Sequence, residues 1–417
     1  MALKKARLAG ARSALLISGG TLVGQIVTFV ALPFLARIYS PAEFGVYSLA
    51  LTITALGLPI AVLRLDRALL LPPLESTTKS LLWAALSIAV VVSAVVGAGT
   101  WLLGTFDRDP VASVLVAILL LTSAAVALFV PLASRSGNYG SLGIRTATQS
   151  ASSTAAQFAF GLAGVTSAGL VAGAAIGSSV GATLLSPYVR RLRGRASLRK
   201  ALASLRLYWR FPVIFMPIAF LTLLAQQMPL LFGASVFGLS AAGVIGMAER
   251  VVAIPVTLLG LAVGTVFESE LARSLRERGG GLRQRYLQTS LALAIIGLLA
   301  GAVLGLLAPW GLTLLFGEEW AVAGQVAQAM SIVVATRLVV SATKNLTQLL
   351  QRGLDSLGLE ITRVVLVAST AGIALVCGLD LIASLWLIYG ALAISDVATW
   401  CWGLRVLRDH ERNGVRL

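Results

Sequence analysis

Residues 80–104 read SLLWAALSIAVVVSAVVGAGTWLLG and carry no charged side chain. A helix needs about 20 mostly apolar residues to cross the hydrocarbon core of a bilayer, so this stretch is long enough to span one. The whole chain of 417 residues has the same character, because 58% of it is hydrophobic and only 12% is charged, about half of the charged share of a soluble protein. The composition excludes an ordinary water-soluble protein and predicts an all-α polytopic membrane protein.

Similar apolar runs, separated by charged or turn-rich breaks, predict twelve membrane spans. The first run follows Lys4, Lys5, Arg7 and Arg12 in the manner of a secretory signal, but it is longer than the apolar region of a signal peptide. We therefore expect it to be retained as the first span. The predicted spans are residues 13–36, 44–68, 80–104, 111–134, 142–164, 167–189, 211–233, 241–267, 288–316, 321–343, 359–379 and 381–403.

The positions of the basic residues predict how these spans are oriented. Lys and Arg gather in the cytoplasmic loops of membrane proteins. With the N-terminus inside, twelve spans place 28 of the 33 Lys and Arg residues in cytoplasmic segments or at cytoplasmic helix ends. Both termini are therefore expected in the cytoplasm. The net charge of +16 reflects this topology, and we predict no binding to nucleic acid.

A strongly basic stretch divides the predicted spans into two sets of six. Residues 190–210 hold eight basic and no acidic side chains, which is a topology signal and, as an alternative, a site for anionic headgroups. Six spans return the chain to the same side, so the halves, residues 1–205 and 206–417, can be parallel repeats. A shift of 198 residues places Arg12 on Arg210 and Gly45-Val46 on Gly243-Val244.

No pattern in the sequence indicates a metal, a disulfide or a bound cofactor. Cys377 and Cys401 lie in apolar runs and His410 is alone near the C-terminus, so metal-ligand spacing is lacking. Glycines recur every four residues in two spans, which is typical of closely packed membrane helices. They lack the preceding strand and following Lys of a phosphate loop. These glycines are Gly169, Gly173, Gly177 and Gly181, and Gly297, Gly301 and Gly305.

Three segments carry a family resemblance. Residues 35–47 read LARIYSPAEFGVY, residues 65–72 read LDRALLLP, and residues 241–248 read AAGVIGMA, followed by Arg250 and Pro255. The first two resemble the opening spans, and the third the eighth span, of polysaccharide transporters. These are the Wzx-type flippases of lipid-linked oligosaccharide (O-antigen) in the multidrug/oligosaccharidyl-lipid/polysaccharide exporter superfamily. Length, span number and cytoplasmic termini match over the whole chain.

The resemblance implies two six-helix bundles that form a V around a central cavity, as in the MATE-like fold. It implies that the protein moves undecaprenyl-diphosphate-linked oligosaccharide from the cytoplasmic to the periplasmic leaflet of a bacterial inner membrane by alternating access. The product would enter O-antigen, lipopolysaccharide or exopolysaccharide biosynthesis. Membrane lipids, and the polysaccharide polymerase with its chain-length machinery, are the implied partners. Lipid II flippases of the superfamily usually have fourteen spans, two more than predicted here.

Charged side chains inside spans are the candidate substrate contacts, because they are costly at membrane depth and should face a cavity or a partner. A diphosphate carries about two negative charges, and guanidinium groups match its oxygens with forked donors. Arg250 lies near mid-depth and is the first candidate. Amides of two polar stripes, on the first and fifth spans, suit sugar hydroxyls. The candidate set is Arg250, Arg337, Arg363, Arg145, Arg64, Arg67, Gln25 and Gln149.

Each candidate also has a purely structural alternative. Glu360 and Arg363 lie three residues apart on one helix face and can neutralise each other. Glu249 and Arg250 are adjacent, about 100° apart around the helix, so we expect one to face the cavity and the other a neighbouring helix. Arg64 and Arg67 share one helix face in the predicted second span and can extend to the cytoplasmic surface. The polar stripes can instead form hydrogen bonds between helices.

The sequence leaves four alternative functions. A flippase has no covalent chemistry to perform, and its ion coupling would use an acid at membrane depth, namely Glu249, Asp66 or Asp396. A cation-coupled multidrug exporter of the same superfamily predicts a cavity that is acidic or aromatic rather than rich in Arg. A glycosyltransferase or polymerase needs a catalytic constellation that short outer loops cannot build. A scaffold without transport leaves the arginines inside the spans unexplained.

Overall fold

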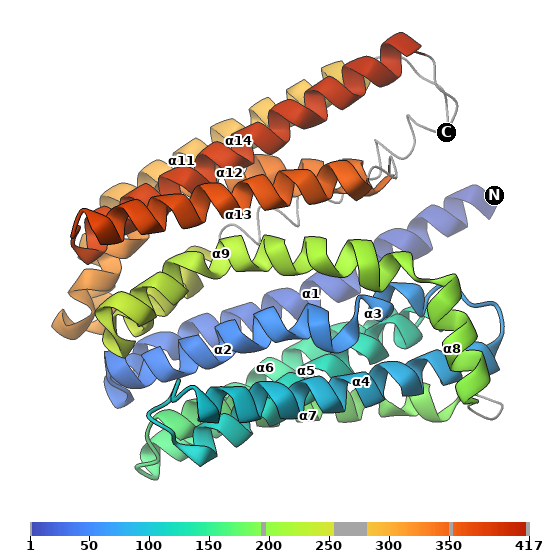
Figure 1. Ribbon diagram of the computed structural model, residues 1–417, viewed down its shortest axis with the longest axis horizontal. Helices are drawn as coiled ribbons and strands as arrows, with labels where there is room; N and C mark the ends of the chain where they lie inside the picture. The colour runs from blue at the N-terminus through green and yellow to red at the C-terminus, as the bar shows by residue number, and fades with distance from the viewer. Residues whose placement is uncertain (1, 193–196, 254–281, 350–352, 414–417) are drawn as a thin grey trace. The chain divides into compact units, whose positions relative to one another are not determined.

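The computed structural model describes residues 2–192, 197–253, 282–349 and 353–413, and within these ranges the chain is helical and has no strand (Figure 1). The described residues form two compact units, Met1–Leu223 and Leu224–Leu417. This division falls inside a helix, and the boundary at residue 205 remains a prediction. The first unit contains α1 (Ala2–Ile38), α2 (Pro41–Val62), α3 (Leu65–Ala68), α4 (Glu75–Leu102), α5 (Pro110–Arg135), α6 (Tyr139–Leu162), α7 (Ser167–Arg190), α8 (Leu198–Leu207) and a π-helical turn, Phe211–Phe215.

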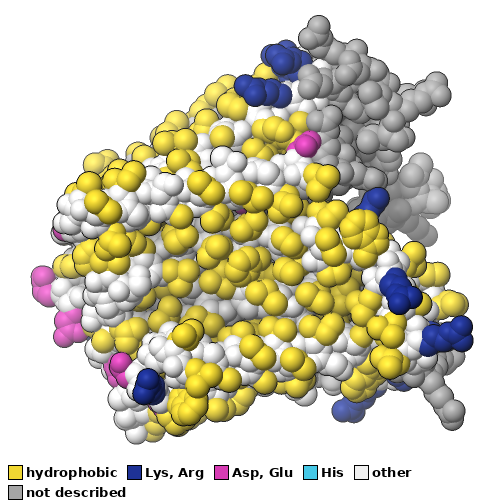
Figure 2. All heavy atoms as spheres, in the orientation of Figure 1, with side chains coloured by type: hydrophobic (Ala, Val, Ile, Leu, Met, Phe, Trp, Pro, Cys, Tyr) yellow, Lys and Arg dark blue, Asp and Glu magenta, His cyan; other side chains and the backbone are white. Residues whose placement is uncertain are grey.

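The second unit begins within α9 (Met216–Phe237) and continues with a helical segment at residues 239–253. Its further helices are α11 (Leu282–Phe316), a 3-10 turn (Glu318–Trp320), α12 (Ala321–Leu349), α13 (Gly353–Val376) and α14 (Leu381–Asn413). Figure 2 shows hydrophobic side chains along the helices and charged side chains near their ends. This distribution is the one that a surrounding bilayer requires.

Ten of the described helices are long and apolar enough to cross a membrane, and each matches one predicted span. The predicted span 142–164 is the helix α6, whose polar stripe lowers its hydropathy. The predicted span 241–267 is helical up to residue 253, and its remainder, with Pro255, lies outside the described residues. The prediction of an all-α polytopic membrane protein is confirmed.

One predicted boundary is wrong. The second span does not continue to residue 68, because α2 ends at Val62 and the chain turns through Leu63 and Arg64. Both residues have positive φ, 47° and 54°, a conformation that costs a non-glycine residue about 1–2 kcal/mol. The turn brings Leu65 into the core, where it is fully buried. The burial of leucines beyond the turn offsets its strain.

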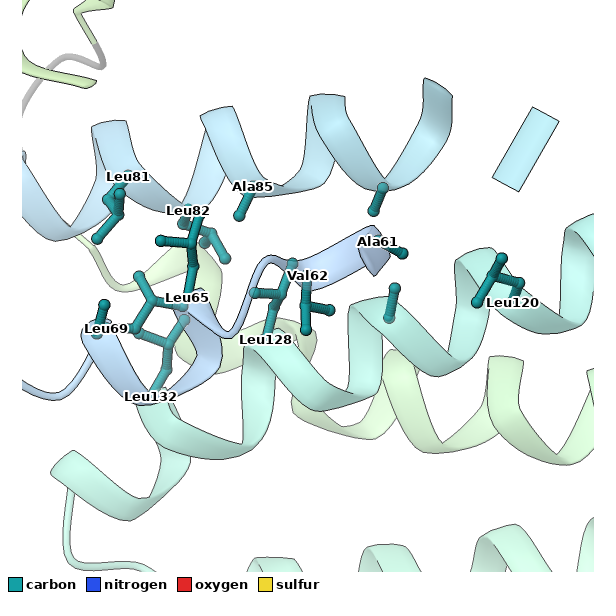
Figure 3. Close-up of a cluster of buried hydrophobic side chains, with 13 residues drawn as sticks. Ala61, Val62, Leu65, Leu69, Leu81, Leu82, Ala85, Leu120, Leu128 and Leu132 are labelled. Carbon is teal, nitrogen blue, oxygen red and sulfur yellow. The ribbon is translucent and has the colours of Figure 1, made fainter. Parts of the chain in front are cut away.

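The core of the first unit forms around this turn. Figure 3 shows Leu65 and Leu69 pointing toward Leu82 of α4 and toward Leu128 and Leu132 of α5. Four of these five leucines have no exposed surface, and Leu132 is 5% exposed. Burying a leucine side chain stabilises a protein in water by about 1.5–3 kcal/mol. Beside a membrane as well as in water, the close packing of these leucines between α3, α4 and α5 holds this end of the unit together.

Arg135, at the end of α5, fastens the loop between α3 and α4. Its Nη1 donates to the carbonyl of Leu69 at 2.9 Å and to Oγ1 of Thr78 at 3.0 Å, and its Nη2 donates to the carbonyl of Pro72 at 3.0 Å. Hydrogen bonds from a charged group are stronger than neutral ones. Arg135 therefore stabilises a loop rather than serving only as a topology signal.

The segment Tyr39–Phe44 shows why the first two helices meet where they do. Ser40 caps α2 and forms a capping box with Glu43, with Pro41 in the first turn. Tyr39 is 2% exposed, and its hydroxyl donates to the carbonyl of Gln157 on α6 at 2.8 Å. Burial and the neighbouring Glu43 carboxylate raise the pKa of Tyr39 to about 12. The phenol therefore keeps the proton that this hydrogen bond needs.

Glycines set the distance between α6 and α7. Three glycines of α7, Gly173, Gly177 and Gly181, face the polar stripe of α6, which consists of Arg145, Gln149, Ser153 and Gln157. A Cβ on Gly177 would stand 2.6 Å from Cβ of Ser153 and 2.7 Å from the carbonyl oxygen of Gln149. A Cβ on Gly173 would stand 2.5 Å from Cγ of Gln157. The predicted packing role of these glycines is confirmed, and the α6 stripe forms much of that interface.

The second unit repeats this device between α11 and α12. A Cβ on Gly297 would stand 2.6 Å from Cα of Ala335, and one on Gly301 would stand 2.9 Å from the carbonyl oxygen of Ser331. Trp400 joins α14 to α11, because its Nε1 donates to Oγ of Ser290 at 2.9 Å and its ring stacks on Tyr286. Small residues and a few directed contacts thus hold the helices of the unit.

Replacing Gly177 with alanine tests the close approach of α6 and α7. An alanine normally favours a helix over glycine by about 1 kcal/mol, but here its Cβ meets backbone atoms that cannot yield without separating the helices. We expect Gly177→Ala to lower the melting temperature of the purified protein in detergent.

The matched control is Gly99→Ala on α4, where no atom lies within 4 Å of the added Cβ. This variant should melt at the wild-type temperature or slightly above it. Equal melting of the two variants would show that the α6–α7 distance is not set by glycine.

Candidate functional site

A polar cavity lies within the second unit. Its volume is about 290 Å³, and half of its lining residues are polar although the surrounding helices are apolar. Amide, carboxylate, guanidinium and phenol groups all reach it. The lining residues are Gln226 and Gln227 of α9, Glu249, Val252 and Ala253 of the 239–253 segment, Met330, Val333, Val334 and Arg337 of α12, and Tyr389 of α14.

Helical periodicity explains how these residues come together. Met330, Val333, Val334 and Arg337 follow steps of three, one and three, so they share one face of α12. Glu249, Val252 and Ala253 follow the same spacing. Each of these two helices presents two or three apolar side chains and one charged residue to the cavity, so each charge lies beside apolar side chains.

Opposite charges meet in this cavity. The Glu249 carboxylate interacts electrostatically with the guanidinium groups of Arg337 and Arg250. Tyr389 is 2% exposed and lies within the field of both Glu249 and Arg337. Coulombic interactions are far stronger in such low-dielectric surroundings than in water. An entering anion would therefore compete with Glu249 for the arginines.

Two donors of the cavity have hydrogen-bonding capacity to spare. The Tyr389 hydroxyl and Nε of Arg337 are buried, and neither makes a hydrogen bond within the described part of the chain. A buried polar group without a partner costs about 1–3 kcal/mol. A ligand with oxygen acceptors would satisfy both donors and recover that free energy.

Glu249 and Arg250 point to different sides of their helix, as expected for adjacent helical residues. Glu249 lines the cavity, and Arg250 is not among the described residues that do. Arg250 is half-buried and interacts with the Glu249 carboxylate. Of these arginines, the cavity lining therefore contains Arg337 and not Arg250.

Arg363 pairs with Asp396 rather than with Glu360. Nη2 of Arg363 donates to Oδ1 of Asp396 at 2.8 Å, with side-chain exposures of 6% and 1%. Oγ1 of Thr336 donates to Oδ2 of the same carboxylate at 3.3 Å. Oε2 of Glu360 is buried and has no hydrogen-bond partner within the described ranges. Arg363 and Asp396 thus lock α13 to α14 and lie outside the lining of the polar cavity.

The candidates of the first unit lie in two places. Nη1 of Arg145 donates to Oε1 of Gln149 at 2.7 Å, and Gln149 packs against Gly181 of α7. Oε1 of Gln25 on α1 is buried, and among the described residues it has no hydrogen-bond partner. These three side chains belong to the α1–α6–α7 group of helices.

The turn after α2 holds the other candidates of this unit. Arg67 is largely exposed, and its Nε lies 3.8 Å from Oδ2 of Asp66. Nε of Arg64 is buried, with no hydrogen-bond partner in the described ranges. The prediction that Arg64 and Arg67 share a helix face is wrong. Arg64 takes the left-handed conformation and lies before α3 begins.

Sequence reasoning missed three of the polar residues that line the cavity. Gln226 and Gln227 are adjacent amides in the middle of an apolar span, Phe211–Phe237, and such a pair at membrane depth is a usable signal. Tyr389 gave no signal, because tyrosines are common in apolar helices and only the fold brings this one beside Glu249.

Comparisons with known proteins agree with the observed fold. Residues 34–325 match the model of a family described as polysaccharide biosynthesis proteins. No match was found among curated protein sequences.

Several solved structures are similar over nearly the whole chain. The lipid II flippase MurJ, in an inward closed conformation, is 12% identical over 94% of this chain and 87% of its own, with a TM-score of 0.68. An inward-facing multidrug resistance MATE transporter of the MOP superfamily is 14% identical over 96% of both chains, with a TM-score of 0.58.

A MOP-superfamily transporter from Pyrococcus furiosus, described as having a binding pocket of reverse polarity that suggests a different function, is 13% identical over 96% of both chains, with a TM-score of 0.56. At these identities the likeness establishes the fold, which is that of MOP-superfamily transporters.

Breaking the Arg363–Asp396 pair should destabilise the second unit strongly. Removal of one partner of a buried pair typically costs about 3–5 kcal/mol, because the other charge remains buried without compensation. We expect Arg363→Leu to lower the melting temperature sharply, and the double variant Arg363→Leu, Asp396→Leu to recover part of the loss. Thermal unfolding in detergent measures both.

The control for this prediction is the exposed pair of the first unit. Arg67→Leu breaks a contact between Arg67 and Asp66 whose side-chain exposures are 65% and 18%, and exposed pairs contribute about 0–1 kcal/mol. If Arg363→Leu were as mild as Arg67→Leu, the buried pair would not hold α13 to α14.

Proposed function

Because the chain belongs to the family of polysaccharide biosynthesis proteins, we propose that it is a flippase for a lipid-linked oligosaccharide. Its substrate is an undecaprenyl-diphosphate-linked oligosaccharide, which it moves from the cytoplasmic to the periplasmic leaflet of a bacterial inner membrane. It works by alternating access with both termini in the cytoplasm, and it makes and breaks no covalent bond. The product enters O-antigen, lipopolysaccharide or exopolysaccharide assembly, where a polymerase and its chain-length machinery consume it.

The observation that carries this proposal is the polar cavity around Arg337. A diphosphate-linked sugar has two kinds of oxygen, charged on phosphate and neutral on hydroxyl. The guanidinium of Arg337 suits the first kind, and the amides of Gln226 and Gln227 and the Tyr389 hydroxyl suit the second. The lipid II flippase MurJ shares the fold, which supports a lipid-linked substrate for this chain.

Glu249 gives the cavity a means of release as well as binding. In the described structure its carboxylate interacts electrostatically with Arg337 and Arg250. We propose that the substrate diphosphate takes the place of Glu249 beside Arg337, and that Glu249 then takes up a proton or a sodium ion. Return of the carboxylate to Arg337 would weaken the hold on the diphosphate. Among the acids at membrane depth, Glu249 fits this coupling role better than Asp396, because Asp396 pairs with Arg363. It also fits better than Asp66, because Asp66 does not line the cavity.

The alternative is a cation-coupled multidrug exporter. One observation favours it, namely that a carboxylate lines the cavity of a chain with the fold of MATE transporters. Such an exporter would hold a cationic drug on Glu249 and Tyr389, and Arg337 would then repel its cargo. The presence of Arg337 in the same cavity is the reason that we place this function second.

Translocation in reconstituted liposomes tests the proposed function. The probe is a short-chain polyprenyl-diphosphate oligosaccharide, and its accessibility on the far leaflet is followed with time. We expect wild-type protein to move it and Arg337→Ala to lower the initial rate by about tenfold or more, the loss expected when a hydrogen bond to a charged group is removed. Arg337→Lys should be intermediate, because it keeps the charge but not the forked donors.

Arg405→Ala is the matched control, since Arg405 is an exposed arginine on α14 of the same unit, and its rate should match that of wild type. Retained transport in Arg337→Ala would remove the cavity from the proposal while keeping the flippase. No protein-dependent transport, together with cation-driven efflux of a cationic dye, would contradict the flippase and establish the alternative.

A further inference from the structure

The short helix α8 presents an apolar stripe to its surroundings at one end of the first unit. Leu198 and Leu202 lie four residues apart and share one side of the helix, with exposures of 77% and 51%. Trp209 follows the helix and is 49% exposed. Three large apolar side chains are thus turned away from the protein within about three helical turns.

Arginines border this stripe. Arg199 and Arg206 are exposed and lie seven residues apart, two turns along one side of α8 and next to the leucines. Arg210 follows Trp209 and is exposed as well. The sequence from 190 to 210 has eight basic and no acidic residues, so no acid of this segment offsets their charge.

The opposite side of α8 is firmly attached to the unit. Ala201 and Ser204 are 4% and 3% exposed, and Leu205 packs against the core shown in Figure 3. Nζ of Lys200 donates to Oγ of Ser76 on α4 at 3.1 Å, and the backbone N–H of Ser197 donates to Oγ of Ser80 at 3.0 Å. The apolar stripe and its arginines are therefore held in a set orientation rather than carried on a loose linker.

The position of α8 along the chain places it at a membrane boundary. It follows the candidate span Ser167–Arg190 and precedes the candidate span Phe211–Phe237. Tryptophan is enriched at the level of lipid headgroups, and an amphipathic helix with basic residues beside an apolar stripe lies in that plane. At such a boundary the apolar stripe meets acyl chains, while arginines at its border reach headgroup phosphates.

We propose that α8 with Trp209 and Arg210 is a binding surface for anionic phospholipid headgroups. Leu198, Leu202 and Trp209 enter the edge of the acyl region, and Arg199, Arg206 and Arg210 bind phosphates of the same leaflet. The occupant is an anionic lipid surface, because a soluble acidic partner would leave the leucines exposed to water. This surface belongs to the first unit, whereas the polar cavity belongs to the second, and it does not depend on which cargo the protein moves.

A lipid titration of the purified full-length protein tests the charge component. Phosphatidylglycerol or phosphatidylcholine is added to the detergent micelles, and the melting temperature reports binding. We expect phosphatidylglycerol alone to raise it in a saturable way. Each arginine near an anionic surface contributes about fivefold to affinity, so R199Q with R206Q should raise the half-saturating lipid fraction by about 30-fold. The control R405Q with R408Q removes two exposed arginines of α14 and should change it by less than about threefold.

Three results of this titration would overturn the proposal. The first is equal loss in the two double variants, which would mean general charge attraction rather than a site on α8. The second is no preference for phosphatidylglycerol. The third is an equal shift with soluble glycerol phosphate, which would indicate an anion site without a lipid surface.

Fluorescence quenching tests the apolar component and does not require the arginine variants to fold. Brominated phosphatidylglycerol should quench the tryptophan emission of the wild-type protein more than brominated phosphatidylcholine does. This excess should disappear in W209F and remain in W83F, because Trp83 is similarly exposed, at 51%, but belongs to α4 and not to the α8 surface. Loss of the excess in both variants or in neither would contradict an anionic lipid surface at Trp209.

Discussion

Hydrocarbon offers no partner to a polar group, and the arrangement of this protein follows from that constraint. Backbone groups are satisfied within helices, which is why the described ranges consist mainly of helices and contain no strand. Side chains face the same requirement. Threonine and serine hydroxyls along the spans mostly donate to carbonyls one turn earlier, as Thr54 does to Ala50 and Ser179 does to Ala175. The charged groups Arg363 and Asp396 instead find each other across two helices.

The charged side chains inside the spans have two different surroundings. Arg363 and Asp396 neutralise each other with almost no exposure, and their effect is to fix α13 against α14. Glu249 and Arg337 also lie near each other, but they border an open volume with amides and a phenol beside them. A pair enclosed by protein is a structural lock, whereas a pair beside a cavity can exchange its partner for a ligand. This difference separates the residues that hold the unit together from those that we assign to the substrate.

Charged side chains at the ends of the spans have roles different from those inside the spans. Arg135 organises a loop by donating to two carbonyls and a hydroxyl, and α8 turns its arginines outward beside exposed leucines. Both belong to the first unit and both adjoin the core around Leu65 and Leu69. The rigid end of that unit is therefore also the part that we propose to rest on anionic lipid, while the polar cavity lies in the second unit.

Sequence alone was enough to predict the class of the protein, the existence of ten spans, the packing role of the glycines and the candidacy of Arg337 and Glu249. These follow from apolar length, spacing and the cost of charge in a membrane, which are local properties of the chain. Three features became visible only in the folded chain: Arg363 pairs with Asp396, 33 residues away, Gln149 faces α7, and Tyr389 joins the cavity. Partner choice depends on which helix faces meet across long sequence separations, and periodicity within one helix does not specify its neighbour.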